Sequence, residues 1–227
     1  MGAESPAPAG GDSGSRSGYL AFAAHEMRNP LSTALWSAEM LARLSPEERA
    51  GPRGVKLSGM CLRALQRLRF LVEDHFLAER LEVGGIPLRM ESVPLREAVA
   101  TASAKARGAD LSAELDEALT VWADRAMLER LLEGLLAVTS RSGGSCAIEG
   151  GRSGALALLR VRGDPPPPDA LSRPQKGTPS DSSGRVLTPF VAAEIARALG
   201  GSLTVAAGSY VLLLPVPPGE SSEDLRP

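Results

Sequence analysis

Two stretches in the first third of the chain constrain its fold more than any other feature, because both carry apolar residues at helical spacing. Apolar positions recur every three or four residues over residues 19–44, and the pattern returns over residues 55–81. A Ser-Pro pair at 45–46 and a Gly-Pro-Arg-Gly stretch at 51–54 separate the two. The sequence therefore predicts two long helices joined by a short connection, an antiparallel hairpin.

The apolar stripe on each predicted helix is too wide for a single neighbouring helix to cover. We therefore expect the hairpin to pair with a second copy and form a four-helix bundle in a homodimer. The apolar positions are Leu20, Phe22, Ala23, Met27, Leu31, Ala34, Leu35, Ala38, Leu41 and Leu44 in the first stretch and Leu57, Cys61, Ala64, Leu65, Leu68, Val72, Phe76 and Leu77 in the second.

The sequence changes character after Gly84-Gly85, where short strand-like runs begin to alternate with helical ones. Mixed order of this kind predicts an α+β layer with helices on one face of a sheet. Strands are predicted at residues 86–90, 120–123, 146–148, 155–161, 202–206 and 210–216, and helices at 95–107, 125–141 and 188–199. The loop over residues 163–184 contains four consecutive prolines and is either a lid or an insertion.

These patterns divide the chain into four parts. Residues 1–17 and 217–227 have little to bury and are predicted to be disordered. Residues 18–83 are predicted to form the helical hairpin, and residues 84–216 the α/β domain.

Composition and charge exclude several classes of function. The net charge of -2 comes from interspersed acids and bases, so the chain lacks the basic surface of a nucleic-acid or anionic-membrane binder. No apolar run reaches the roughly 20 residues that cross a bilayer, and the first residues lack the layout of a signal peptide. We expect a cytoplasmic protein with no membrane partner. Two cysteines without CxxC spacing and two histidines argue against a disulfide framework and a metal site.

The segment His25-Glu26-Met27-Arg28-Asn29-Pro30-Leu31 lies in the first predicted helix. This segment closely resembles the H-box of bacterial sensor histidine kinases, a His-Glu-x-x-Asn/Thr-Pro-Leu pattern. The elements that follow resemble the ATPase-type α/β sandwich of the same family. The resemblance implies a bacterial two-component signalling enzyme of the phosphotransferase class, whose hairpin serves dimerisation and phosphotransfer, with His25 as the phosphoacceptor.

The residue types of the motif suit this chemistry. An imidazole is a nucleophile when one ring nitrogen is unprotonated, and Glu26 can accept the other N–H and stabilise the charge that builds during attack. Asn29 lies one helical turn after His25 on the same face, where the family resemblance implies that it positions water for dephosphorylating a receiver. Pro30 cannot donate a backbone N–H and is expected to kink the helix after the active turn.

Three sequence boxes that bind nucleotide in this family are degenerate in this chain. The metal-binding asparagine position falls on Val138, which offers no oxygen to Mg²⁺, and an earlier asparagine position falls on Gly134. Arg-Gly-Asp-Pro-Pro at residues 162–166 stands where Asp-x-Gly-x-Gly is expected, and only Gly184 remains of the last glycine-rich box. We therefore expect no ATP, metal or other cofactor in this chain, with Mg²⁺ supplied by a partner receiver.

The sequence thus favours a histidine phosphotransferase of a phosphorelay, which exchanges a phosphoryl group between His25 and the aspartate of a response-regulator receiver domain and also acts as a receiver phosphatase. Two alternatives remain open. One is an ATP-dependent sensor-type autokinase with a divergent nucleotide site. The other is a non-catalytic adaptor that sequesters a response regulator.

Overall fold

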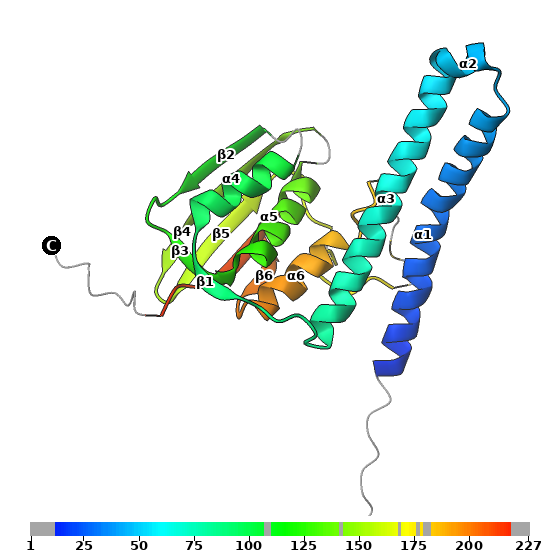
Figure 1. Ribbon diagram of the computed structural model, residues 1–227. Helices are drawn as coiled ribbons and strands as arrows, with labels where there is room; N and C mark the ends of the chain where they lie inside the picture. The colour runs from blue at the N-terminus through cyan, green and yellow to red at the C-terminus, as the bar shows by residue number, and fades with distance from the viewer. Residues whose placement is uncertain are drawn as a thin grey trace, which may run out of the picture. The chain divides into compact units, whose positions relative to one another are not determined.

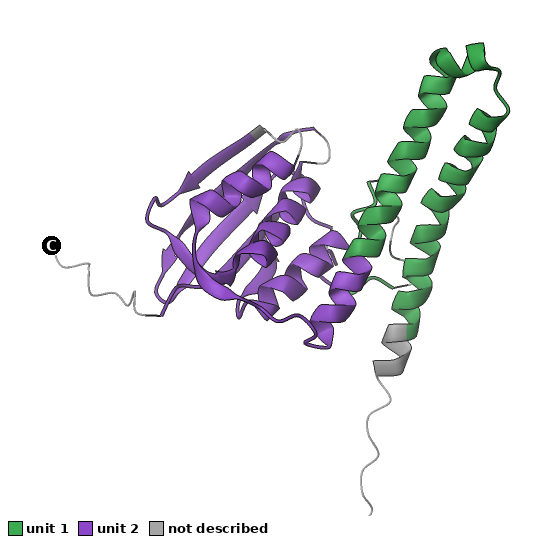
Figure 2. Ribbon diagram, in the orientation of Figure 1, with its two compact units in different colours: residues 1–73, 173–186 green, residues 74–172, 187–227 purple. Residues whose placement is uncertain are grey.

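The computed structural model of the protein describes residues 12–106, 110–140, 143–167, 169–175, 178 and 183–218. The chain divides into two compact units (Figure 2). Unit 1 comprises residues 1–73 and 173–186, and unit 2 comprises residues 74–172 and 187–227. Most of the terminal stretches predicted to be disordered, residues 1–17 and 217–227, lies outside the described residues. The predicted helical hairpin and the α+β layer after it are both confirmed.

Unit 1 is built on two long antiparallel helices (Figure 1). Helix α1 spans Asp12–Ala42, a short helix α2 spans Pro46–Ala50, and helix α3 starts at Pro52 and runs to Glu82, past the end of the unit. Helix α1 begins six residues before the predicted start of the hairpin, since an established helix gains a hydrogen bond for each residue that extends it. It also continues through Pro30 as a single helix.

The connection between the long helices is held by a capping box. The Ser45 hydroxyl accepts a hydrogen bond from the Glu48 backbone N–H (3.2 Å), and the Glu48 carboxylate accepts one from the Ser45 N–H (3.0 Å). With Pro46 at the first helical turn, these bonds start α2 immediately after the predicted break. The chain reverses here and returns as α3.

The two helices bury one another only in part. Phe22 and Ala34 of α1 and Leu57, Ala64 and Leu71 of α3 are among the buried residues. Large apolar side chains remain exposed along the same helices, as the predicted width of the stripe requires. They are Leu20, Leu31, Leu35 and Trp36 in α1 and Val55, Leu62, Leu65 and Phe76 in α3.

Unit 2 contains a five-stranded sheet in the order β2-β4-β5-β7-β6 and a two-stranded antiparallel sheet of β1 and β3. Strand β2 is parallel to β4, and the other neighbours are antiparallel. Helices α4, α5 and α6 cover one face of the large sheet (Figure 1). The elements are β1 Met90–Pro94, α4 Leu95–Lys105, β2 Asp110–Leu115, β3 Thr120–Asp124, α5 Arg125–Thr139, β4 Ser145–Ser153, β5 Leu156–Arg162, α6 Thr188–Ala198, β6 Ser202–Ala206 and β7 Ser209–Pro215.

The core of unit 2 lies between these helices and the sheet. Helix α5 presents a continuous leucine face to it, and alternate residues of the central strands meet that face. Fully buried members are Leu128, Leu131, Leu132, Leu135 and Leu136 of α5 and Ile148, Leu159 and Leu212 of the sheet.

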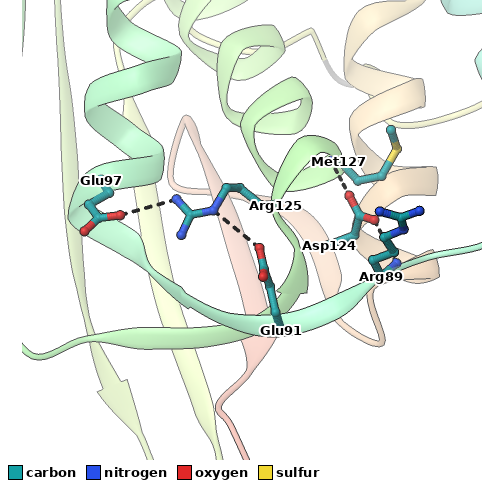
Figure 3. Close-up of polar contacts among 6 residues, drawn as sticks. All are labelled: Arg89, Glu91, Glu97, Asp124, Arg125 and Met127. Carbon is teal, nitrogen blue, oxygen red and sulfur yellow. Dashed lines mark hydrogen bonds and ion pairs between the residues drawn. The ribbon is translucent and has the colours of Figure 1, made fainter.

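The start of α5 is fixed by Asp124, the last residue of β3 (Figure 3). One carboxylate oxygen accepts a hydrogen bond from the Met127 backbone N–H at 3.0 Å, which caps the helix. The other accepts one from the Arg89 backbone N–H at 2.9 Å, just before β1. One side chain therefore joins the two-stranded sheet to the helix.

Arg125 adds a second link at the same corner (Figure 3). Its guanidinium lies 3.4 Å from a Glu91 oxygen of β1 and 3.3 Å from a Glu97 oxygen of α4. Both carboxylates are exposed, so each pair contributes only about 0–1 kcal/mol. The pairs orient α4 and α5 more than they stabilise them.

Three strands differ from the sequence-based expectation, and the simplest difference is that β4, predicted over residues 146–148, extends over Ser145–Ser153. Strand β2 was not predicted, because Asp-Leu-Ser-Ala-Glu-Leu favours a helix locally and becomes a strand only by pairing with β4 at the edge of the sheet. The strand predicted over residues 86–90 lies instead at Met90–Pro94. Its position is set by pairing with β3, in which Val93 faces Val121.

Among the described residues, none of the helices combines the length and the apolar character that a bilayer crossing requires.

Candidate functional site

His25 lies in α1 with its imidazole directed to solvent. Its side chain is 66% exposed, whereas that of the next residue, Glu26, is only 2% exposed. Successive helical residues point about 100° apart, so one faces outward and the other inward. The two still meet at their tips, because His25 Nδ1 lies 3.5 Å from Glu26 Oε1. The exposed imidazole therefore has a buried carboxylate beside one nitrogen.

The second oxygen of that carboxylate faces a cation on the other helix. Glu26 Oε2 accepts a hydrogen bond from the Arg67 guanidinium of α3 at 3.3 Å. A carboxylate withdrawn from water is costly unless a cation or hydrogen-bond donors compensate it. Glu26 thus connects His25 of α1 to Arg67 of α3.

Arg67 was missed by the sequence reasoning, although a signal for it exists. It stands three residues after Ala64 and four before Leu71, both buried, so it falls on the apolar stripe of α3. A cation on such a stripe requires an anion on the facing helix. Glu26 stands four residues after buried Phe22, so it lies on the inward face of α1 and can supply that anion.

Asn29 stands one turn after His25 with its side chain exposed. Its backbone carbonyl accepts a hydrogen bond from the Thr33 hydroxyl at 3.1 Å. The structure therefore places all three predicted site residues, His25, Glu26 and Asn29, within one turn of α1, with His25 and Asn29 open to solvent.

The loop predicted to be a lid or an insertion contributes residues to unit 1. The Arg173 guanidinium lies 4.9 Å from the Tyr19 ring of α1. Immediately after the loop, the Arg185 guanidinium lies 4.2 Å from the Phe70 ring of α3. Gly184, with φ 77°, packs against the stem of Arg67. The described part of this segment thus contacts both helices of the hairpin.

The asparagine positions expected to bind a metal–nucleotide group are closed by packing. Val138 is buried at 2% exposure. A Cβ added at Gly134 would lie 2.8 Å from the Thr188 methyl group of α6, so the space of a side chain there is already filled. The Thr188 hydroxyl donates a hydrogen bond to buried Asp74 at 2.6 Å, which keeps the methyl group in this place.

At the second nucleotide box, residues 162–166, the chain packs directly against the backbone of Thr139. The Asp164 N–H donates a hydrogen bond to the Thr139 carbonyl at 2.6 Å, and a Cβ at Gly163 would lie 2.3 Å from that same oxygen. Across the described ranges, no group of three or more His, Cys, Asp or Glu side chains could hold a metal ion. At the two asparagine positions, Val138 and Gly134 provide no side-chain oxygen, whereas Mg²⁺ needs oxygen ligands.

Comparisons with known proteins agree with this architecture. The family model of the His Kinase A (phospho-acceptor) domain matches residues 15–84. The solved structure of the Acinetobacter baumannii histidine kinase AdeS is similar with a TM-score of 0.65 and 20% identity, over 85% of this chain and 98% of that chain. Full-length ShkA in complex with AMPPNP is similar with a TM-score of 0.55 and 17% identity, over 88% of this chain and 45% of that chain. No curated protein matches the sequence significantly.

The chain is thus a helical hairpin with an exposed histidine beside a buried carboxylate, followed by an α/β layer. Residues 15–84 match the family model of the His Kinase A (phospho-acceptor) domain, and the chain has the fold of solved histidine kinases. The resemblance to a histidine kinase core and the fold predicted from the sequence are thereby confirmed.

Proposed function

We propose that the protein is a histidine phosphotransferase of a two-component phosphorelay, which exchanges a phosphoryl group between His25 and the aspartate of a response-regulator receiver domain. The observation that carries this proposal is the exposed His25 imidazole, whose Nδ1 lies 3.5 Å from a nearly buried carboxylate. A rigid, solvent-facing nucleophile of this kind is accessible to the active site of a second protein.

The transfer step needs little from this chain beyond alignment. With the Nδ1–H directed to Glu26, the lone pair of Nε2 attacks the phosphorus of the receiver's aspartyl phosphate. The N–P bond forms as the P–O bond breaks, and the aspartate carboxylate leaves with the electron pair. The imidazole ring keeps its Nδ1 proton and gains positive charge, which the Glu26 carboxylate stabilises. A Mg²⁺ ion held by the receiver would supply the positive charge that neutralises the phosphoryl oxygens.

The nature of the α5 and α6 contacts supports a protein rather than ATP as the phosphoryl donor. Buried Val138 and the Thr188 methyl group at Gly134 leave no oxygen ligands where the metal-binding asparagines are expected. The alternative is an autokinase with a remodelled nucleotide site. A protein of this fold has been solved with AMPPNP, which keeps that alternative open to test.

Asn29 supports a second activity, receiver phosphatase. Its exposed amide stands at i+4 from His25 and can orient a water molecule toward a phosphoryl group docked at the imidazole. Exposed apolar side chains on the hairpin, Leu31 and Leu35 on α1 and Leu62 and Leu65 on α3, support homodimerisation through a four-helix bundle.

The proposal is tested by incubating the full chain with a panel of phosphorylated receivers, in parallel with Mg²⁺–ATP alone. We expect label to move from at least one receiver to the wild type but not to His25→Ala, and no label from ATP. Labelling by ATP would support the autokinase. Tight receiver binding that is unchanged in His25→Ala, with no transfer, would support the adaptor.

A further inference from the structure

Arg67 stands between the phosphoacceptor pair and the segment that returns to the hairpin from the α/β layer. On one side its guanidinium donates to Glu26 Oε2 at 3.3 Å. On the other side its stem packs against the backbone of Gly184. No part of the proposed transfer chemistry uses Arg67 directly, yet the carboxylate that faces His25 contacts it.

We propose that Arg67 is a positioning residue for phosphoryl transfer through His25, and that Gly184 holds Arg67 in its working position. This inference rests on the proposed function. Arg67 holds the Glu26 carboxylate in place, and Glu26 in turn orients the His25 imidazole.

The two carboxylate oxygens of Glu26 contact different partners. Oε2 faces the guanidinium and Oε1 faces His25 Nδ1 at 3.5 Å. A glutamate has three rotatable side-chain bonds, and water would attract its charge outward. The Arg67 cation keeps the charge between the helices, so Oε1 stays in place to accept the Nδ1–H. The neutral imidazole then carries its lone pair on Nε2, the exposed nitrogen that attacks phosphorus.

Gly184 restricts the alternatives open to Arg67. A Cβ at this position would lie 2.3 Å from Arg67 Cγ and 3.1 Å from its Cα, so backbone lies directly against the stem of the side chain. The next residue, Arg185, stacks on Phe70, one turn after Arg67 in α3. Gly184 therefore lies against Arg67, with Arg185 anchored on the neighbouring Phe70, and this disfavours rotamers that turn the guanidinium away from Glu26.

The experiment measures two quantities on the full chain: the tautomer of His25, from ¹⁵N chemical shifts of its ring nitrogens, and the rate of phosphoryl transfer from a receiver. The chain has two histidines, so His75 serves as the internal reference. The variants are Arg67→Ala, Arg67→Lys and Gly184→Ala.

Matched controls separate positioning from general damage. Arg63→Ala removes another arginine one turn earlier in α3. Gly208→Ala introduces a side chain at a similar positive φ of 70° with nothing within 4 Å, so it carries the backbone strain of Gly184→Ala without the contact.

We expect Arg67→Ala and Gly184→Ala to shift His25 from the Nδ1–H form toward a mixture of tautomers and to slow transfer on the order of 10- to 100-fold. Arg67→Lys should restore part of the Nδ1–H population and part of the transfer rate, because lysine supplies the positive charge but not the planar guanidinium. Arg63→Ala and Gly208→Ala should match wild type in both the His25 tautomer and the transfer rate.

An unchanged tautomer in Arg67→Ala, or equal shifts in Arg63→Ala and Arg67→Ala, would overturn the proposal. If wild type accepts phosphate from no receiver while the tautomer still responds to Arg67, the proposed function fails and the positioning role stands. A loss of rate with an unchanged tautomer would make Arg67 structural only.

Discussion

Replacement of Asp74 by alanine is expected to destabilise unit 2 strongly. Asp74 lies in α3 with its side chain 1% exposed. One carboxylate oxygen accepts a hydrogen bond from the Arg130 guanidinium of α5 at 2.5 Å, and the other accepts one from the Thr188 hydroxyl at 2.6 Å. A single buried charge thus ties together three helices of the unit.

The magnitude follows from what the alanine leaves behind. The Arg130 side chain is 21% exposed, so a largely buried cation loses its short ion pair. Breaking a buried pair from one side costs about 3–5 kcal/mol, and each hydrogen bond to a charged group is worth about 1.5–3 kcal/mol. We expect Asp74→Ala to lower the free energy of unfolding by about 3–5 kcal/mol and Thr188→Val by about 1.5–3 kcal/mol.

Urea unfolding followed by Trp122 fluorescence measures both changes. The chain has two tryptophans, so a Trp36→Phe background leaves Trp122 of β3 as the only reporter. Glu73→Ala is the matched control, because Glu73 is the exposed neighbour of Asp74. Its ion pair with Arg69 is exposed on both sides, so we expect its loss to cost less than about 1 kcal/mol. A loss below about 1 kcal/mol in Asp74→Ala would refute the assignment of a stabilising role to this network.

Three further changes test other parts of the structure. Gly134→Ala is expected to lower the stability of unit 2 by about 1–3 kcal/mol, because the new Cβ contacts the Thr188 methyl group. In thermal unfolding, the same substitution should cost less in a Thr188→Ser background, where that methyl group is absent. An equal loss of stability in the wild-type and Thr188→Ser backgrounds would contradict the proposed contact. Leu35→Glu places a charge on the exposed apolar face of the hairpin and should convert a dimer to a monomer in light scattering, whereas a persistent dimer would place the interface elsewhere. Asn29→Ala should lower receiver dephosphorylation on the order of tenfold or more while transfer to His25 continues, and loss of both activities together would argue against water positioning.

The hairpin could be predicted because its signal is local. Apolar spacing over more than seven helical turns defines α1 and α3, and the Ser45-Pro46 pair marks the reversal through a capping box formed by neighbouring residues. His25, Glu26 and Asn29 could be proposed as site residues because the segment that resembles the H-box is also local. One helical turn brings them together whatever the rest of the chain does.

Features that depend on distant contacts could not be predicted in the same way. Strand β2 follows from pairing with β4, against the helical preference of its own sequence. Arg67 meets Glu26 across 41 positions, and Thr188 meets Asp74 across 114, so their partners are decided only when the helices pack. The sequence shows that the expected asparagine is absent at Gly134. It does not show that the Thr188 methyl group occupies the space beside this position.

The central claim is that His25 receives its phosphoryl group from a receiver domain. Its most direct test is to mix the ATP-free full chain with a phosphorylated receiver, digest the product under alkaline conditions and locate the phosphoryl group by mass spectrometry. The account predicts phosphohistidine at His25, absent in His25→Ala and formed without nucleotide. Phosphohistidine that appears at His25 only when Mg²⁺–ATP is added would contradict it.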